Sequence, residues 1–239
     1  MADNMISAAL SRQKGLMKEL LTVTNNIANA DTAGYRAEGV VFSEYVEALD
    51  KSDSLSMTRA AGRTIDMSQG EIITTKDPLD IAISGDGFFL VETEGGPRLT
   101  RAGHFSLNHQ GEIVDNEGRR VLGEGASAIA IPQGAQEIAV SAGGDISADG
   151  QLVGRFGVVT APQIDLVREG DNLFRAANGY EPVLEPSVTQ GALEGSNVNA
   201  MGEFVRLIEV QRAYEGTKGF LDKEADRLKQ LVETLGRPE

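Results

Sequence analysis

The sequence predicts an α+β protein in which helices at both ends pair as a coiled-coil-like base and an antiparallel β-rich domain lies between them. Near both ends, apolar residues recur at helical spacing, whereas the middle alternates short apolar stretches with glycine-rich turns. The 239 residues divide accordingly into an N-terminal helical segment (1–36), an extended linker (37–78), a β-rich domain (79–190) and a C-terminal helical segment (191–239).

The first helix is predicted from an apolar stripe between Ile6 and Ile27. Asn-Ala-Asp-Thr-Ala-Gly follows it, so the helix should end near Asn29, with Gly34 able to adopt the positive φ of a helix exit. The stripe consists of Ile6, Leu10, Met17, Leu20 and Ile27, widened by Leu16 and Val23.

The last helix is predicted over residues 199–235, where the spacing of apolar residues is close to a heptad repeat with one break in phase near Leu221. A helix of ~37 residues would be roughly 55 Å long, which is too long for the cap of a small β domain. Pairing with the first helix is the economical arrangement, and the alternative is that each helix packs separately on the β domain. The seam comprises Leu207, Val210, Tyr214, Thr217, Leu221, Ala225, Leu228, Val232 and Leu235.

Strand and turn patterns begin near Leu79 and continue to the end of the predicted β-rich domain. Turn sequences such as Gly85-Asp86-Gly87 and Gly95-Gly96 separate short alternating stretches, as in an antiparallel sheet. Residues 37–78 lack this pattern. We expect them to combine a short helix at Phe42–Leu49 with a polar, serine-rich loop.

Charge and composition exclude several functional classes. The net charge of −14 is concentrated in residues 37–190, which carry 24 acidic and 11 basic side chains, so we expect no nucleic-acid partner. The absence of cysteine excludes a thiolate zinc site and a cysteine nucleophile. No apolar run approaches the ~20 residues of a membrane span, and the first residues lack a Sec signal pattern, so we expect neither membrane insertion nor Sec export.

Three motifs resemble the signatures of the flagellar rod and hook protein family, in the family's order. The first is Asn25-Asn26-Ile27-Ala28-Asn29 with Thr32, Gly34 and Tyr35. The second is Gly85-Asp86-Gly87-Phe88-Phe89 followed by Leu99-Thr100-Arg101-Ala102-Gly103-His104-Phe105. The third is Glu194-Gly195-Ser196-Asn197-Val198-Asn199 followed by Gln211-Arg212-Ala213-Tyr214. On residues alone, the asparagines of the first motif are either helix caps or interface groups.

The resemblance implies a structural subunit of the flagellar basal-body rod, a tube that spans the periplasm, transmits torque and passes exported subunits. Its partners would be other copies of itself, other rod proteins and the flagellar type III export apparatus. Of the two large rod types, the opening residues 5–13 favour the proximal type over the distal type. The implied assembly interface is Asn25, Asn26, Ile27, Asn29, Thr32, Gly34, Tyr35, Ser196, Asn197, Val198, Asn199, Gln211, Arg212, Tyr214, Leu221 and Leu228.

Outside this family, the rival hypotheses are an acidic β-domain hydrolase and a secreted adhesin or binding module. Neither explains apolar seams at both chain ends. His104 and His109 lie five residues apart, which places them on opposite faces of a strand, and Asp145-x-Ser147-x-Asp149-Gly150 has Phe156 where a calcium loop needs glutamate. We therefore predict no catalytic, cofactor-binding or metal-binding residues.

Overall fold

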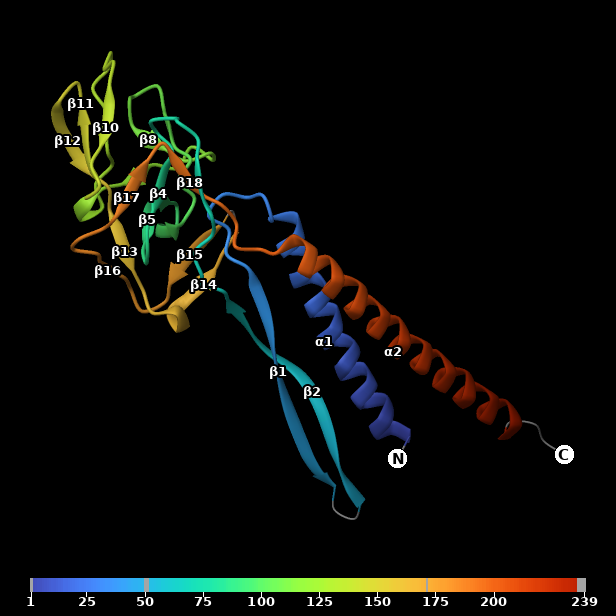
Figure 1. Ribbon diagram of the computed structural model, residues 1–239. Helices are drawn as coiled ribbons and strands as arrows, with labels where there is room; N and C mark the ends of the chain where they lie inside the picture. Colours follow the sequence, from blue (N-terminus) through green and yellow to red (C-terminus); the bar gives the residue numbers. More distant parts are fainter. Residues whose placement is uncertain (1, 50–51, 171, 236–239) are drawn as a thin grey trace. The chain divides into compact units, whose positions relative to one another are not determined.

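The computed structural model describes residues 2–49, 52–170 and 172–235, and its class is α+β (Figure 1). The chain forms two compact units. The first, here called the helical unit, consists of Met1–Ala28, Ala37–Asp66 and Asn199–Glu239. The second, called the β unit, consists of Asn29–Arg36 and Met67–Val198. The end of the first motif and residues 67–78 thus belong with the β strands, whereas residues 37–66 belong with the helices.

Two antiparallel helices form most of the helical unit, α1 (Ala2–Ala28) and α2 (Ala200–Leu235) (Figure 1). Glu19 of α1 accepts a hydrogen bond from Nε of Arg206 of α2 at 2.7 Å. The first half of the predicted seam of α2 is buried or half-buried, and Val210 is only 3% exposed, whereas Ala225, Leu228 and Val232 of its second half are exposed. We call this first half of the seam the inner seam: Leu207, Val210, Tyr214, Thr217 and Leu221.

The apolar stripe predicted for α1 coincides only in part with its buried face: Val23 is buried, and Ile6, Leu16, Leu20 and Ile27 are half-buried. Leu10 and Met17 are 44% and 43% exposed. The buried positions are Gly15, Glu19, Thr22, Val23 and Asn26, which recur at helical spacing but are mostly small or polar. The polar part of this face was not predicted from apolar periodicity, because hydrophobicity alone cannot identify a polar side chain that is buried together with its hydrogen-bond partner.

The predicted short helix at Phe42–Leu49 is wrong, because this segment belongs to a long antiparallel hairpin. Strand β1 (Glu38–Leu49) pairs with β2 (Ser52–Ile65) in a register that begins with Glu38 opposite Ile65. The segment Val40-Val41-Phe42 is rich in β-branched and aromatic residues, which favour an extended strand. The hairpin packs on α1 at Gly15, where an added Cβ would lie 3.1 Å from a ring carbon of Phe42.

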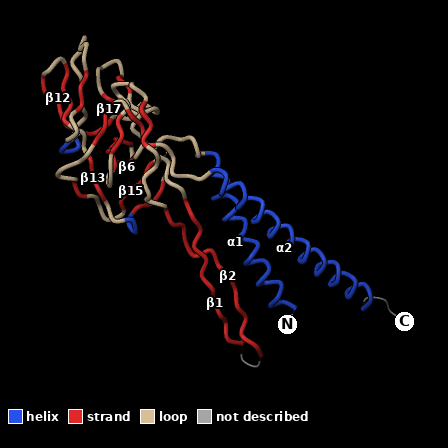
Figure 2. Tube along the Cα trace, in the orientation of Figure 1, coloured by secondary structure: helices blue, strands red, loops and turns tan. Residues whose placement is uncertain are grey.

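Every strand pair described in the β unit is antiparallel, and Figure 2 shows its short strands joined by loops. Its largest sheet has the order β14-β15-β6-β5-β13-β16, with β9 also paired to β5. The strands are β3 (Ile72–Thr74), β4 (Ile81–Ile83), β5 (Phe88–Thr93), β6 (Gly96–Thr100), β7 (Ser106–Leu107), β8 (Ile113–Val114), β9 (Val121–Leu122), β10 (Ile138–Val140), β11 (Asp145–Ala148), β12 (Gln151–Arg155), β13 (Val158–Thr160), β14 (Leu166–Arg168), β15 (Leu173–Ala176), β16 (Glu181–Pro182), β17 (Val188–Gln190) and β18 (Ala192–Glu194), with 3-10 turns at Glu124–Ala126 and Gln163–Asp165.

Aromatic rings fill the centre of the β unit. Phe89 is fully buried, and its ring meets Phe105 edge-on at 5.1 Å and Phe156 at 5.6 Å between centroids. Around them, buried aliphatic residues from most strands complete one hydrophobic core, as strand alternation with one buried face requires. The predicted antiparallel β domain is therefore present, although it starts earlier than residue 79 and ends later than residue 190.

The last two strands of the β unit pair with its first two. β17 pairs with β4 and β18 pairs with β3, both antiparallel. This arrangement brings the first and last parts of the unit together. Among the described residues, neither helix is long and apolar enough to cross a membrane.

Candidate functional site

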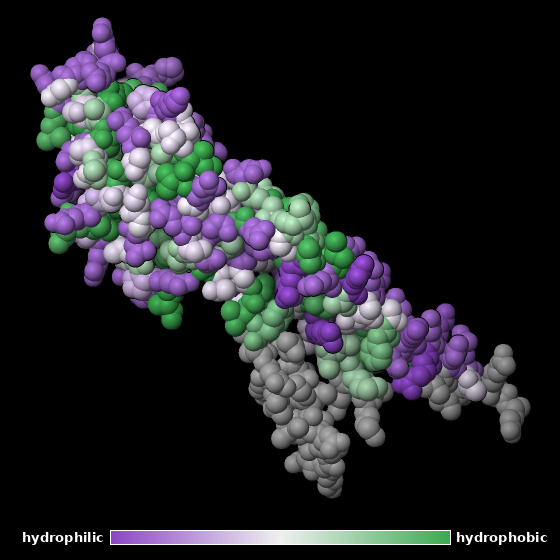
Figure 3. Space-filling model, viewed as in Figure 1, coloured by the Kyte–Doolittle hydropathy of each residue, from purple (hydrophilic) through white to green (hydrophobic). Residues whose placement is uncertain are grey.

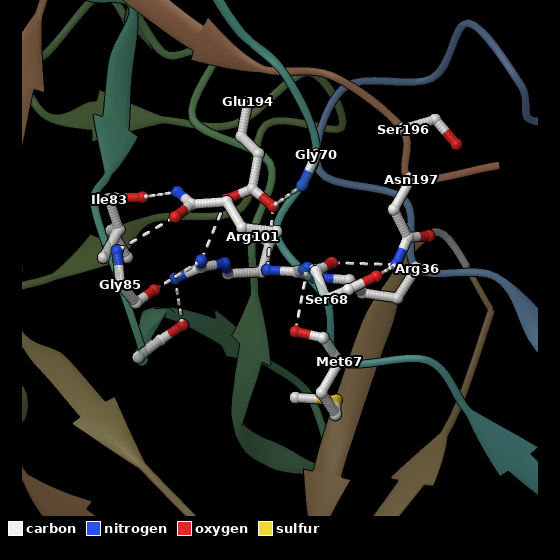
Figure 4. Close-up of polar contacts among 12 residues, drawn as sticks. Arg36, Met67, Ser68, Gly70, Ile83, Gly85, Arg101, Glu194, Ser196 and Asn197 are labelled. Carbon is white, nitrogen blue, oxygen red and sulfur yellow. Dashed lines mark hydrogen bonds and ion pairs between the residues drawn. The ribbon is translucent and has the colours of Figure 1, made fainter.

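The three sequence motifs meet at one buried cluster of charged side chains in the β unit (Figure 4). The carboxylate of Glu194 contacts a guanidinium nitrogen of Arg36 at 2.8 Å and one of Arg101 at 2.9 Å. All three side chains are only 1–2% exposed. We call these residues the arginine–glutamate cluster. Arg36 directly follows the first motif, Arg101 lies within the second and Glu194 begins the third, so the motifs share a physical role within a single subunit.

Backbone carbonyls hold the two arginines in place. Arg101, which directly follows β6, donates to the carbonyl oxygens of Gly87 at 2.6 Å and Gly85 at 2.7 Å. Arg36 donates to the carbonyl oxygens of Met67, at 3.1 Å, and of Ser68. Because guanidinium groups carry several donors in a fixed plane, each arginine can bind the carboxylate and bridge backbone segments together.

Glu194 is held from its own side as well. It ends β18, and its carboxylate accepts a hydrogen bond from the backbone N–H of Gly70 at 3.2 Å. Desolvation lowers the pKa of Arg101 to about 10, an effect that the neighbouring Glu194 carboxylate opposes. Arg101 therefore remains protonated at neutral pH, and burial of its charge is unfavourable unless the carboxylate is present.

A second group of contacts fixes the segment between α1 and β1. The guanidinium of Arg168, in β14, lies between the rings of Tyr35 and Phe174, 4.4 Å and 4.8 Å from their centroids. Arg168 also donates to the carbonyl oxygen of Arg36, and Asn172 donates to that of Ala33 at 3.0 Å. Such cation–π contacts are favourable when water is excluded. Arg168 lies outside all three motifs, and nothing in its sequence surroundings distinguishes it from a surface arginine.

Gly34 lets the same segment approach the β unit closely. Its φ is +68°, and an added Cβ would lie 2.3 Å from the carbonyl carbon of Arg101. Its N–H donates to the carbonyl oxygen of Glu194 at 2.7 Å, and the N–H of Asn197 donates to the carbonyl of Tyr35 at 3.3 Å. Residues of the first and third motifs therefore run side by side, joined by backbone hydrogen bonds.

Asn26 has an intrachain role in the helical unit. Its side-chain amide donates to the carbonyl oxygen of Glu38 at 2.8 Å and accepts from the N–H of Glu38 at 3.0 Å. The amide thus makes the pair of backbone hydrogen bonds with Glu38 that a neighbouring β strand would make. Asn26 is only 1% exposed. The amide thus caps the start of β1 from the face of α1.

The residues predicted for an assembly interface differ in exposure. Asn26, Gly34 and Tyr35 are buried within one chain. Asn197 donates to the carbonyl of Ser68 at 2.8 Å, and Asn199 accepts from the N–H of Gly202 at 3.1 Å as the N-cap of α2. The half-buried members are Ile27, Asn29, Thr32, Ser196, Asn197, Val198, Tyr214 and Leu221, and the exposed members are Asn25, Asn199, Gln211, Arg212 and Leu228.

A further apolar surface on α2 was not predicted. Met201, Phe204, Val205 and Ile208 are 75%, 48%, 54% and 51% exposed. Their spacing places them on one side of the helix, and we call them the outer stripe. Figure 3 shows hydrophobic side chains near the start of α2 and mainly hydrophilic ones toward its end. The helical spacing of these four residues is visible in the sequence. It was not used to predict a second apolar surface, because the seam alone explained the helical periodicity.

Comparison with known proteins places the chain in one family. Residues 6–36 match the family described as flagella basal body rod protein, residues 82–148 match the flagellar hook protein FlgE/F/G D1 domain, and residues 189–217 match the flagellar basal body rod FlgEFG protein C-terminal family.

Full-length relatives agree with these matches. The flagellar basal-body rod protein FlgF of Caulobacter vibrioides is 36% identical over 98% of this chain and 99% of its own length. The FlgF of Escherichia coli is 32% identical over 96% of this chain and 98% of its own length. The FlgG of Bacillus subtilis is 31% identical over 94% of this chain and 96% of its own length. The chain therefore belongs to the flagellar basal-body rod protein family, as a structural subunit of the FlgF type.

Proposed function

We propose that this subunit polymerises through its helical unit into the proximal part of the rod, a tube that transmits torque and passes exported subunits. The observation that carries the proposal is the outer stripe of α2, an apolar surface that packing within one chain leaves exposed. Contiguous exposed apolar surface on a soluble protein is typical of interaction sites. Its natural occupant is the helical unit of a neighbouring rod subunit.

The geometry of α1 and α2 favours a contact that repeats. α1 exposes Leu10, Met17 and Leu21, at 44%, 43% and 52%, so both helices present apolar residues outward. When one such surface meets a different surface on the next copy, the contact is heterologous, and repetition builds a helical assembly. Burial of each large apolar side chain in such a contact is worth roughly 1.5–3 kcal/mol.

The coiled-coil-like character of the base belongs to this proposal. The inner seam packs within one chain, but α2 has 36 residues and α1 has 27. The seam continues along α2 through Leu228 and Val232, which are 41% and 70% exposed. A helix of a neighbouring copy that continued the heptad pattern here would extend the pairing beyond one subunit. Two exposed members of the predicted interface, Gln211 and Arg212, lie on the same helix.

We assign the β unit a supporting, non-enzymatic role outside the tube wall. It carries 20 acidic and 9 basic side chains, which suits a solvated surface. Delivery by the flagellar type III export apparatus fits a chain without cysteine, because no disulfide has to be broken or formed along the route. The periplasmic segment of the basal body is the proposed location.

Aspartate substitutions on the outer stripe test the proposal. Phe204→Asp and Ile208→Asp should leave the purified subunit folded but prevent rod assembly, because a buried charge replaces an apolar contact. Leu152→Asp is the matched control, since Leu152 is 74% exposed on β12 of the β unit. Images of isolated basal bodies and swimming assays give the readout. Motile cells with complete rods in both stripe variants would rule out this surface as the subunit contact.

A distal-rod role is the second candidate, because FlgG of Bacillus subtilis is similar over 94% of this chain. Both roles use the same helical contacts and differ in position along the rod. A tag inserted in the exposed turn near Gly118, located in images of isolated basal bodies, separates them. Signal near the inner membrane supports the proximal role, and signal near the hook supports the distal one.

A further inference from the structure

The last residues of the β unit complete its strand pairing. β4 has three almost fully buried residues, Ile81, Ala82 and Ile83, at 0%, 1% and 2% exposure. On one side, the N–H of Ile81 donates to the carbonyl of Gly103 at 2.9 Å. On the other side, the whole of β4 pairs with β17. Without β17, one edge of a strand at the centre of the core would have no backbone partner, which is costly in a buried position.

Polar side chains from the same final segment bind distant parts of the unit. The side-chain amide of Gln190 accepts from the N–H of Val140 at 3.0 Å and donates to the carbonyls of Pro78 at 2.8 Å and Ile138 at 2.9 Å. Four residues later, Glu194 supplies the carboxylate of the arginine–glutamate cluster. Both side chains replace water around groups that become buried only when the segment is in place.

The charge balance makes Glu194 the decisive member of this segment. Arg36 and Arg101 lie on segments that precede it by most of the β unit, and both are buried in the folded state. Asp86, an exposed carboxylate, also favours the charged form of Arg101, but less than Glu194 does. Burial of the two guanidinium groups therefore becomes favourable only when the Glu194 carboxylate is present.

We propose that Glu194 is the closing residue of the β unit, so that the unit reaches its folded state only when the chain is present through about Asn197. The β unit then folds in a single cooperative step that requires its last segment. A chain that lacks this segment keeps exposed strand edges and solvated arginines, and therefore stays unfolded. For a chain delivered N-terminus first, as the proposed export route requires, closure cannot occur while residues near 194 are still inside the channel.

Hydrogen exchange on the full chain tests the proposal. Glu194→Gln should lower the folding equilibrium constant of the β unit by about a hundredfold to a thousandfold, because it removes one partner of a buried ion pair. Exchange should accelerate together in β3, β4 and β5 and in β17, which lies far from them in sequence. Glu185→Gln is the matched control: Glu185 is exposed, so the same loss of charge should leave exchange unchanged.

A double-mutant cycle with Arg101→Met identifies the cause. If the carboxylate acts by compensating the buried cation, Glu194→Gln should cost several-fold less in the Arg101→Met background than in the native one. Additive effects would overturn the proposal. So would faster exchange confined to β3 and β18, since a local contact would loosen its own strands without opening the core.

A cellular measurement links closure to delivery while keeping the two proposals distinct. Glu194→Gln should be exported at least as well as the native chain, because it is less able to fold, but it should fail to accumulate in rods. If the native chain itself is not exported by the type III route, that part of the proposed function fails, whereas the exchange results still decide closure. Export of Glu194→Gln below the native level, with native export intact, would contradict the link between closure and delivery.

Discussion

The two units of the molecule bury very different numbers of apolar side chains. The β unit surrounds Phe89, Phe105 and Phe156 with aliphatic residues. In the helical unit, the buried side chains among those the structure describes include Glu19, Thr22, Asn26 and Glu38, whereas its buried apolar ones are Val23, Ile65 and Val210. The outer stripe of α2 stays exposed. The β unit has an extended apolar core, and α2 of the helical unit carries an exposed apolar stripe.

Charge follows the same division. The β unit has 20 acidic and 9 basic side chains, and the helical unit has 16 and 13. A strongly acidic surface keeps copies of the β unit apart in solution, while a nearly balanced helical unit can approach copies of itself without strong repulsion. The units therefore differ in net charge as well as in apolar burial.

The largest expected difference between the units comes from truncating an aromatic side chain in each. Phe89→Ala should destabilise the β unit by about 3–5 kcal/mol, because Phe89 is fully buried against two other rings. Phe204→Ala in the helical unit removes a ring that is 48% exposed and should change monomer stability by less than about 0.5 kcal/mol. Urea denaturation followed by circular dichroism measures both. Equal losses would contradict the contrast between the units.

Two glycine substitutions in the β unit test whether the close approach of Gly34 to Arg101 matters for stability. Gly34→Ala should destabilise it by more than the roughly 1–2 kcal/mol that positive φ alone costs, because the new Cβ would also meet the backbone of Arg101. Gly118→Ala is the control: its φ is +79°, and no atom lies within 4 Å of an added Cβ. Thermal unfolding of both variants gives the comparison. If Gly118→Ala costs as much as Gly34→Ala, the close approach at Gly34 is unimportant.

The sequence predicted the elements with strong periodicity and missed those set by contacts. The second helix and the end of the first were predicted to within one residue, since the apolar repeats and the turn after Asn29 are local signals, whereas the first helix begins at Ala2, ahead of the predicted Ile6. The hairpin Glu38–Ile65 was missed because Phe42, Tyr45, Val46 and Leu49 also have helical spacing, and the pairing partner that favours the strand lies across the turn.

The candidate site shows the same limit. The motifs were recognised, but their convergence on Glu194 depends on strand pairing between the first and last strands of the β unit, which no local pattern contains. Charged residues inside otherwise apolar motifs, such as Arg101, were the available signal. The buried position of Asn26 could not be inferred either, because an asparagine near a helix end is as often a cap as a buried clamp.

A buried amide tests how polar contacts hold the helical unit together. Asn26→Ala should destabilise the contact between α1 and β1 by about 1–3 kcal/mol, because it leaves the backbone N–H and C=O of the buried Glu38 without the amide that now binds both. Hydrogen exchange should accelerate at Glu38 and its neighbours in β1, and peptides from β4 and β5 of the β unit should be unaffected. Gln230→Ala, at an exposed position of α2, is the control.

Asn26→Asp separates the two hydrogen bonds of this clamp. The aspartate keeps an acceptor for the Glu38 N–H but loses the donor to the Glu38 carbonyl, and it places a negative charge beside the buried Glu38 side chain. It should therefore be no better than alanine, although it is closer to asparagine in shape. If Asn26→Asp keeps native exchange in β1, the donor bond is dispensable. If Asn26→Ala leaves β1 unchanged but abolishes rods, the amide acts between subunits and the intrachain role assigned to it is wrong.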